Sequence, residues 1–144
     1  ILYMKYIIII VCLFIIILYL YHLYKDITSI KYWESKNKIV LHNLNNMLKY
    51  VYFDVLDTEN KFLHAGTLLG CVRNNKIIPW DDDIDIGIYV KNYKEIDKLK
   101  QMIKNNIDSS KYIVNNIFFG IKIINRENNA AIDIMFYIFI NSNN

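Results

Sequence analysis

Residues Tyr6 to Tyr24 contain no charged side chain, YIIIIVCLFIIILYLYHLY, and this run limits what the rest of the chain can build. About 20 apolar residues in a helix span the hydrocarbon core of a bilayer, and the run is close to that length. The rest of a 144-residue chain is too small to bury such a helix on every side. We therefore expect a transmembrane anchor over residues 1–25, followed by a single small domain.

A cleaved signal peptide is the alternative interpretation of this run. The residues that follow it, KDITSIKYWESK, contain no small-residue cleavage site of the Ala-x-Ala type, which favours the anchor. Tyr19, Tyr21 and Tyr24 cluster toward one end of the run, where aromatic rings prefer the headgroup level. Lysines are more frequent after the run than before it, so the positive-inside rule places the domain in the cytoplasm.

Composition excludes several other classes of protein. The formal net charge is +3, and acidic and basic residues are mixed along the sequence. A nucleic-acid-binding domain would show a basic stripe or run, so we expect no nucleic-acid partner. The two cysteines, Cys12 and Cys71, form no Cys-x-x-Cys pair, which argues against a thiolate zinc site and a disulfide framework.

Hydrophobic patterns after the run predict helices and strands that alternate along the chain. Helical spacing of apolar residues occurs over residues 35–56 and 93–107, and a short helical turn is expected over 66–72. Alternating or short apolar runs predict strands over residues 62–65, 83–88, 112–114, 118–124 and 131–140. We expect an α+β domain with a mixed β-sheet flanked by helices, at residues 41–144, after a juxtamembrane segment at 26–40.

Four carboxylates fall within five positions, at Asp81, Asp82, Asp83 and Asp85. Like charges this close repel one another unless a cation lies among them. Strand geometry places Asp83 and Asp85 on the same face, about 6.6 Å apart along the backbone, so both can bind one cation. Carboxylate oxygens suit Mg²⁺ or Mn²⁺. A solvated acidic turn is the alternative, and it accounts less well for four acids that run into an apolar strand.

The segment His64-Ala65-Gly66-Thr67 is typical of a strand end followed by a helix start. Free N–H groups at a helix N-terminus bind phosphate, so Gly66 and Thr67 are candidate substrate-binding residues. An ordinary helix N-cap is the alternative. Arg73 follows this turn, and we expect it either to bind a phosphate or to pair with one of the aspartates.

A Gly-Thr helix start followed by an Asp-hydrophobic-Asp strand resembles the core pattern of the nucleotidyltransferase superfamily. Members of that superfamily usually add a third carboxylate from a later strand, and Asp133, within AAIDIMFYIF, is the best candidate for it. A buried acid between Ile132 and Ile134 is costly without a partner, which a metal ion would supply. The expected metal ligands are Asp83, Asp85 and Asp133, which are also the expected catalytic residues.

Two strings closely resemble the LicD/fukutin family of phosphotransferases: GTLLG with the following Val72-Arg73, and IPWDDDIDIG. The later Ile132-Asp133-Ile134 is similar to the IDI(F) segment of that family, and the resemblance covers about residues 44–137. It implies a nucleotidyltransferase-like fold, and transfer of phosphocholine or ribitol phosphate from a CDP-linked donor to a glycan hydroxyl. It also implies Asp83, Asp85 and Asp133 as metal ligands, with Gly66 and Thr67 at the phosphate site.

Family members are often membrane-associated, so the resemblance also bears on partners and location. We expect a CDP-linked donor, a glycan acceptor and a membrane as partners. The expected location is the Golgi or ER membrane in a eukaryote, and otherwise the cytoplasmic membrane.

The chain departs from the family pattern in two respects. Cys71 stands where the family often has a small residue such as alanine, and family members usually continue well beyond the position of Asn144. A C-terminally truncated domain is therefore expected. Two other functions stay open: a nucleotidyltransferase that moves NMP itself, and a non-catalytic binding or assembly subunit.

Overall fold

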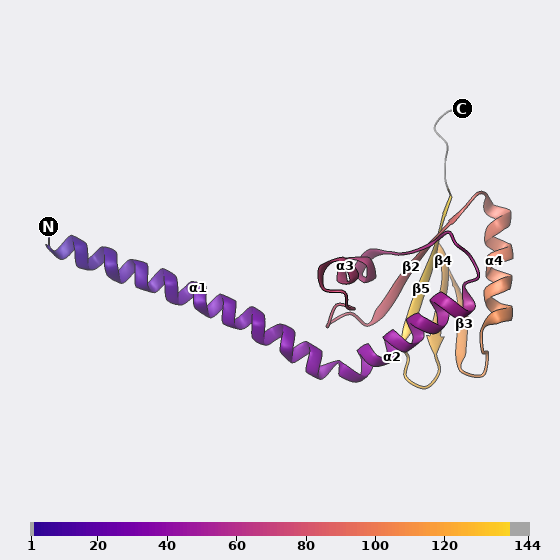
Figure 1. Cartoon of the computed structure of the whole chain (residues 1–144), viewed down its shortest axis with the longest axis horizontal. Coiled ribbons are helices and arrows are strands. Elements are labelled where there is room, and N and C mark those ends of the chain that lie inside the picture. Colours follow the sequence, from indigo (N-terminus) through magenta and orange to yellow (C-terminus); the bar gives the residue numbers. More distant parts are fainter. Residues whose placement is uncertain (1, 139–144) are drawn as a thin grey trace, which may run out of the picture. The chain divides into compact units, whose positions relative to one another are not determined.

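A computed structural model of the chain describes residues 2–138, and it divides the chain into two compact units, Ile1–Lys36 and Asn37–Asn144. The first unit contains the helix α1, Leu2–Lys36, which Figure 1 shows in indigo and violet. Its segment Tyr3–Lys36 is long and apolar enough to cross a membrane, with a mean hydropathy of 2.7 in its most apolar window. A signal sequence near an N-terminus has the same properties, so membrane crossing stays a prediction.

The second unit is built on a five-stranded sheet with the order β1-β2-β5-β4-β3. The neighbouring strands β2 and β5 pair in parallel, whereas the other neighbours pair antiparallel. The sheet is therefore mixed, and the predicted α+β class is confirmed. The strands are β1 Lys61–Leu63, β2 Asp83–Val90, β3 Tyr112–Ile117, β4 Gly120–Asn125 and β5 Ala131–Ile138.

Helices flank this sheet, as the sequence predicts (Figure 1). The predicted helix over residues 35–56 is α2, Lys38–Lys49, continued by a π-helical segment, Tyr50–Val55. The predicted turn at 66–72 is a full helix, α3, Ala65–Asn74. The last helix is α4, Tyr93–Asn106.

The core lies between one face of the sheet and the helices α2 and α4. Isoleucines at alternate positions of the three inner strands are fully buried on this face: Ile84, Ile86, Ile88, Ile121, Ile123, Ile132 and Ile134. They belong to one cluster with Leu44 and Met47 of α2 and Ile103 of α4. Because side chains alternate along a strand, the residues between these isoleucines lie on the opposite face of the sheet.

The predicted strands have different limits in the structure: those expected over residues 62–65, 83–88 and 112–114 are β1 Lys61–Leu63, β2 Asp83–Val90 and β3 Tyr112–Ile117. The strand expected from residue 118 begins at Gly120, because Phe118 and Phe119 form the turn between β3 and β4. Gly120 is required there, since a Cβ atom would lie 1.8 Å from the Ile134 carbonyl oxygen of β5. The strand expected over residues 131–140 is seen to Ile138, and its last two positions lie outside the described residues.

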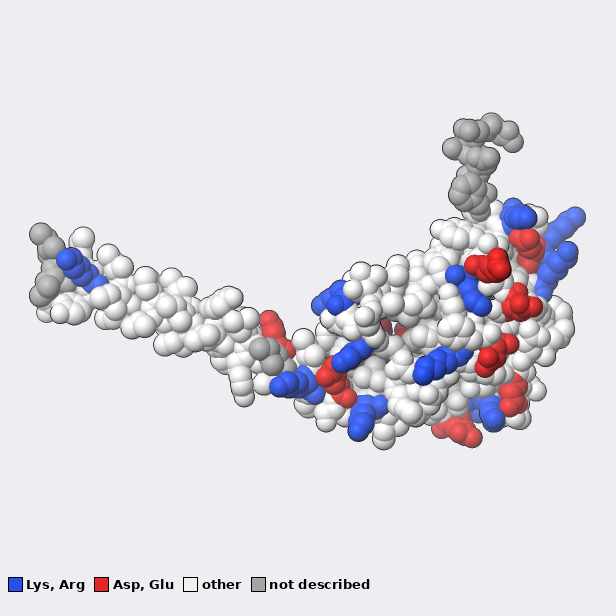
Figure 2. Space-filling model, viewed as in Figure 1, with Lys and Arg blue, Asp and Glu red and all other residues white. Residues whose placement is uncertain are grey.

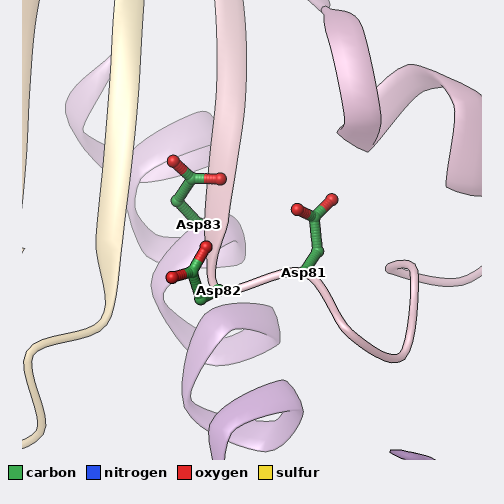
Figure 3. Close-up of side chains that lie close together, drawn as sticks. All are labelled: Asp81, Asp82 and Asp83. Carbon is green, nitrogen blue, oxygen red and sulfur yellow. The ribbon is translucent and has the colours of Figure 1, made fainter.

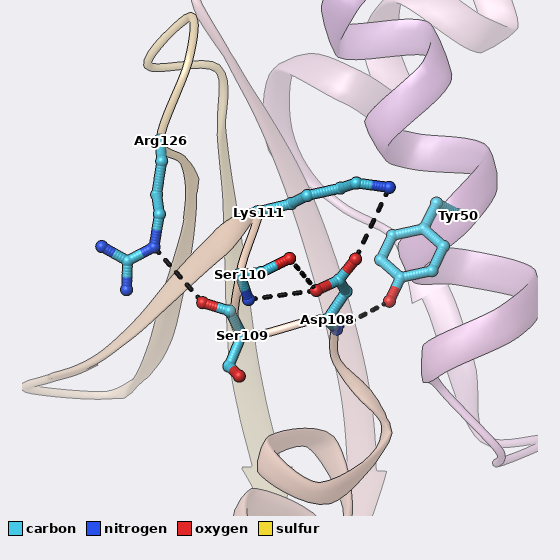
Figure 4. A network of polar contacts seen from close by, with 6 residues as sticks. All are labelled: Tyr50, Asp108, Ser109, Ser110, Lys111 and Arg126. Atoms are coloured by element: carbon cyan, nitrogen blue, oxygen red, sulfur yellow. Dashed lines mark hydrogen bonds and ion pairs between the residues drawn. The ribbon is translucent and has the colours of Figure 1, made fainter.

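The connection between α4 and β3 is held by a polar network around Asp108 (Figure 4). The Asp108 N–H donates to the Tyr50 hydroxyl at 2.9 Å, and the Asp108 carboxylate accepts from the Ser110 N–H at 3.0 Å. Lys111 Nζ lies 3.5 Å from the same carboxylate. Asp108 is therefore a turn residue.

On the face drawn in Figure 2, acidic and basic side chains lie interspersed over the second unit.

Candidate metal centre

The parallel pairing of β2 with β5 brings the three predicted ligands together. Asp85 lies directly beside Asp133 in the register, and Asp83 lies one pleat away on the same face. Carboxylate oxygens of the three side chains all lie within 4.8 Å of one another. Oxygens that share one cation are about 3–4 Å apart, so a small inward movement would suffice for them to share a divalent ion.

These carboxylates lie in an unfavourable electrostatic environment. Burial raises the pKa of the Asp85 carboxyl, and the neighbouring charges of Asp83 and Asp133 raise it further. Burial likewise raises the pKa of Asp83, followed by the charges of Asp133 and Asp82. A cation among the three would offset both desolvation and repulsion.

One oxygen of this group is buried without a hydrogen bond. Asp133 Oδ1 is buried and has no hydrogen-bond partner, although Lys122 Nζ lies 3.1 Å away in an ion pair of unsuitable hydrogen-bond geometry. A buried acceptor without a donor is costly, and binding a metal ion would satisfy it. The donor set is oxygen only, which fits Mg²⁺ or Mn²⁺.

A second group of acids, Asp81, Asp82 and Asp83, shares one member with the first (Figure 3). Their carboxylates lie where the loop before β2 enters the strand. Asp82 is exposed, whereas Asp81 is partly buried, and burial raises the pKa of Asp81, followed by the charge of Asp83.

The start of α3 lies against these acids. A Cβ atom on Gly66 would lie 2.7 Å from Asp81 Oδ2, so the missing side chain makes room for this carboxylate. Ala65, the preceding residue, has a φ of 42° in the left-handed region, which costs a residue with a Cβ atom about 1 kcal/mol. Such strain is typical of functional sites, and here it turns the chain from β1 into the helix.

Thr67 has a structural bond that the sequence did not reveal. Its side chain is 3% exposed, and its hydroxyl oxygen accepts a hydrogen bond of 2.8 Å from the backbone N–H of Asp85. The His64 N–H donates to the Asp85 carbonyl at 3.1 Å, so the edge of β2 is bonded to α3 where β1 ends. Thr67 therefore fixes the backbone of a predicted metal ligand.

Arg73 is not brought to the acids in the same way. It is exposed in the last turn of α3, about 10 Å along the helix axis from Gly66. Within residues 2–138 no acidic side chain forms an ion pair with it. The structure thus places Gly66 and Thr67 beside the carboxylates and Arg73 at the far end of the helix.

Two residues near the centre were not predicted as part of it. Lys122 is the residue of β4 directly opposite Asp133. Its signal in the sequence is a single charge within an apolar strand, between Ile121 and Ile123, which is the same signal that marks Asp133. Tyr137 lies on the same face of β5, and its hydroxyl is 2.8 Å from His64 Nε2.

Comparison with known proteins shows the family to which the chain belongs. Residues 60–144 match the domain described as LicD/FKTN/FKRP, nucleotidyltransferase domain. The chain belongs to this family. The matched region contains Gly66, the acids from Asp81 to Asp85, and Asp133, so every predicted ligand falls inside the LicD domain.

Individual relatives align over short stretches. Ribitol 5-phosphate transferase FKRP of Homo sapiens is 44% identical over 39 residues, which are 27% of this chain and 8% of that protein. Uncharacterized protein RP689 of Rickettsia prowazekii is 63% identical over 27 residues, 19% of this chain and 10% of that protein. The CdnC:HORMA-deltaN complex of E. coli MS115-1 aligns with a TM-score of 0.40 and 12% identity over 79% of this chain and 36% of that chain, a likeness too low for any conclusion.

Proposed function

We propose that this chain is a divalent-metal-dependent phosphotransferase, which moves a phospho-alcohol from a CDP-linked donor to a glycan hydroxyl. LicD family membership supports a transferase, and the similarity to a ribitol 5-phosphate transferase supports a group of the ribitol-phosphate or phosphocholine type. The observation that carries the proposal is the convergence of Asp83, Asp85 and Asp133 on one face of the sheet.

The three aspartates would hold the ion, and the start of α3 would bind phosphate. When bound, Mg²⁺ or Mn²⁺ supplies positive charge that stabilises the diphosphate of the donor and the leaving CMP. Backbone N–H groups at the first turn of α3, around Gly66 and Thr67, would donate to phosphate oxygens beside the carboxylates.

The acceptor hydroxyl has to lose a proton as its oxygen bonds to phosphorus and the bond from phosphorus to CMP breaks. Asp81 is better placed than Asp82 to take this proton, because it is partly buried against Gly66 whereas Asp82 is exposed. Burial also raises the pKa of Asp81, which makes its carboxylate a stronger base.

The proposal includes anchoring by α1, supported by the length and apolar composition of that helix. A membrane anchor would hold the domain close to membrane-bound glycans. The proposed location is the Golgi or ER membrane in a eukaryote, and otherwise the cytoplasmic membrane.

The test is CMP release by the full chain in detergent micelles, with CDP-ribitol or CDP-choline as donor and Mn²⁺ present. Chelation should stop the release, and Asp133→Asn should remove most of it. Asp97→Asn, which changes an exposed acid on α4, is the matched control and should retain the rate. Transfer of labelled cytidine to the acceptor would instead indicate NMP transfer. Metal binding without cleavage of any donor would indicate a non-catalytic subunit.

A further inference from the structure

Lys122 brings a positive charge into the candidate metal centre. It lies on β4, directly across from Asp133 on β5, and its Nζ is 3.1 Å from Asp133 Oδ1. The two side chains are 31% and 18% exposed, so this is a largely desolvated pair rather than a solvated surface contact. Both neighbours of Lys122 in the strand are fully buried in the core on the other face.

The contact is held by charge and not by a hydrogen bond. Asp133 Oδ1 is buried and has no hydrogen-bond partner even with the ammonium beside it. The field of Lys122 also reaches Asp83, where it opposes the raised pKa of that carboxyl. Lys122 thus offsets part of the negative charge of the three clustered carboxylates.

The same oxygen cannot serve both cations equally well. A divalent ion bound by all three aspartates needs a free lone pair on Asp133, and its charge would repel an ammonium group a few ångströms away. Lys122 is half-buried on a long, flexible stem, which can turn its ammonium group toward solvent, whereas the Asp133 carboxylate is fixed close to the sheet.

We infer that Lys122 is the resident counter-ion of this centre, and that a divalent cation displaces it from Asp133 on binding. This inference rests on the metal centre of the proposed function, but not on the transfer reaction. Lys122 thereby stabilises the metal-free protein and weakens its affinity for metal.

Binding of Mn²⁺ to the full chain in detergent micelles, followed by the electron paramagnetic resonance of free Mn²⁺, tests this directly. Lys122→Met should bind Mn²⁺ roughly tenfold more tightly, because a nearby positive charge is removed. Lys122→Arg keeps the charge and should bind like the wild type. Lys111→Met is the matched control, since Lys111 pairs with Asp108 outside the centre, and it should change nothing.

A second measurement needs no variant and covers the case in which Lys122→Met fails to fold. Acetic anhydride labelling of the wild-type protein, read by mass spectrometry, should increase at Lys122 when Mn²⁺ is added and stay constant at Lys111. Unchanged labelling, or equal Mn²⁺ affinity in Lys122→Met, would overturn the inference while the metal centre stands. A wild-type protein that binds no Mn²⁺ would instead overturn the metal centre of the proposed function.

Discussion

Asp85 belongs to two parts of the site, one through its side chain and the other through its backbone. Its carboxylate lies among the acids of β2 and β5, while its backbone N–H donates to the hydroxyl of Thr67 in α3. The position of the carboxylate therefore depends on a hydrogen bond made by the same residue to a different element. Positioning of this kind is expected where ligands must be held to within a fraction of an ångström.

Replacement of Thr67 by valine should disturb this arrangement. The variant leaves the Asp85 N–H without an acceptor, which should lower the free energy of unfolding by about 1–3 kcal/mol. Denaturant unfolding measures the loss, and Mn²⁺ affinity should fall as well. Thr67→Ser keeps the hydroxyl and serves as the control. Equal stability of the valine and serine variants would show that the bond contributes little.

The stability of the metal-free protein should depend on pH in a definite direction. Burial first, and then neighbouring carboxylates, raise the pKa values of Asp83 and Asp85 in the folded state above those of the unfolded chain. The folded state therefore binds more protons, and the free energy of unfolding falls as pH rises through the raised pKa values. These two groups should add stability as pH is lowered from neutral toward about 4.

Thermal unfolding over this pH range gives the measurement. At neutral pH, bound Mn²⁺ should offset the repulsion between these carboxylates and raise the free energy of unfolding. The stability of the protein should then depend less on pH. Asp83→Asn should flatten the profile relative to Asp97→Asn, which alters an exposed acid elsewhere. A profile that is equally steep in both variants would assign the pH dependence to other groups.

At the scale of elements, α3 and β2 meet where a glycine leaves space for a carboxylate. Gly66 lies in the first turn of α3, and Asp81 Oδ2 occupies the position beside it that any larger residue would need. Asp81 lies in the loop before β2. This loop can approach α3 closely because Gly66 has no side-chain methyl group.

Gly66→Ala should therefore act through Asp81. The added methyl group should push the carboxylate away and reduce CMP release several-fold, with a smaller effect on thermal stability because the acid can turn toward solvent. A double-mutant cycle with Asp81→Ala checks this mechanism. The double variant should lose no more rate than Asp81→Ala alone, and additive losses would mean that Gly66 acts independently of Asp81.

Much of this element pattern could be predicted from the sequence, and the failures are informative. Alternation in DIDIGI predicts the strand and the shared face of Asp83 and Asp85, because a period of two is local information. The partnership of Asp133 with Lys122 could not be predicted, since it depends on which strands pair and in what register. The hydrogen bond between Thr67 and Asp85 was missed because it depends on how α3 packs against β2.

At the scale of the whole molecule, the chain combines a long apolar helix with a small α+β domain. The helix exposes its side chains throughout Tyr3 to Tyr24, and water is a poor environment for so much apolar surface. A lipid bilayer would remove this surface from water. The anchor prediction therefore says that the entire protein is found in the membrane fraction.

Membrane extraction tests this prediction. The full chain, expressed in cells, should stay in the membrane fraction after washing with alkaline carbonate and should keep its N-terminal residues, because a spanning helix is removed only by detergent. A peripheral protein treated in parallel is the control and should be released. A soluble mature form that begins near residue 25 would show that the run is a cleaved signal.

The order of the strands has a consequence for how the protein is made on the ribosome. β2 is synthesised early and pairs with β1 on one side. Its partner on the other side, β5, is the last strand of the described chain. Until β5 emerges, one edge of an isoleucine-rich strand stays open to pairing with other chains. The nascent domain therefore passes through an aggregation-prone stage, which ends at the same step that delivers the third aspartate.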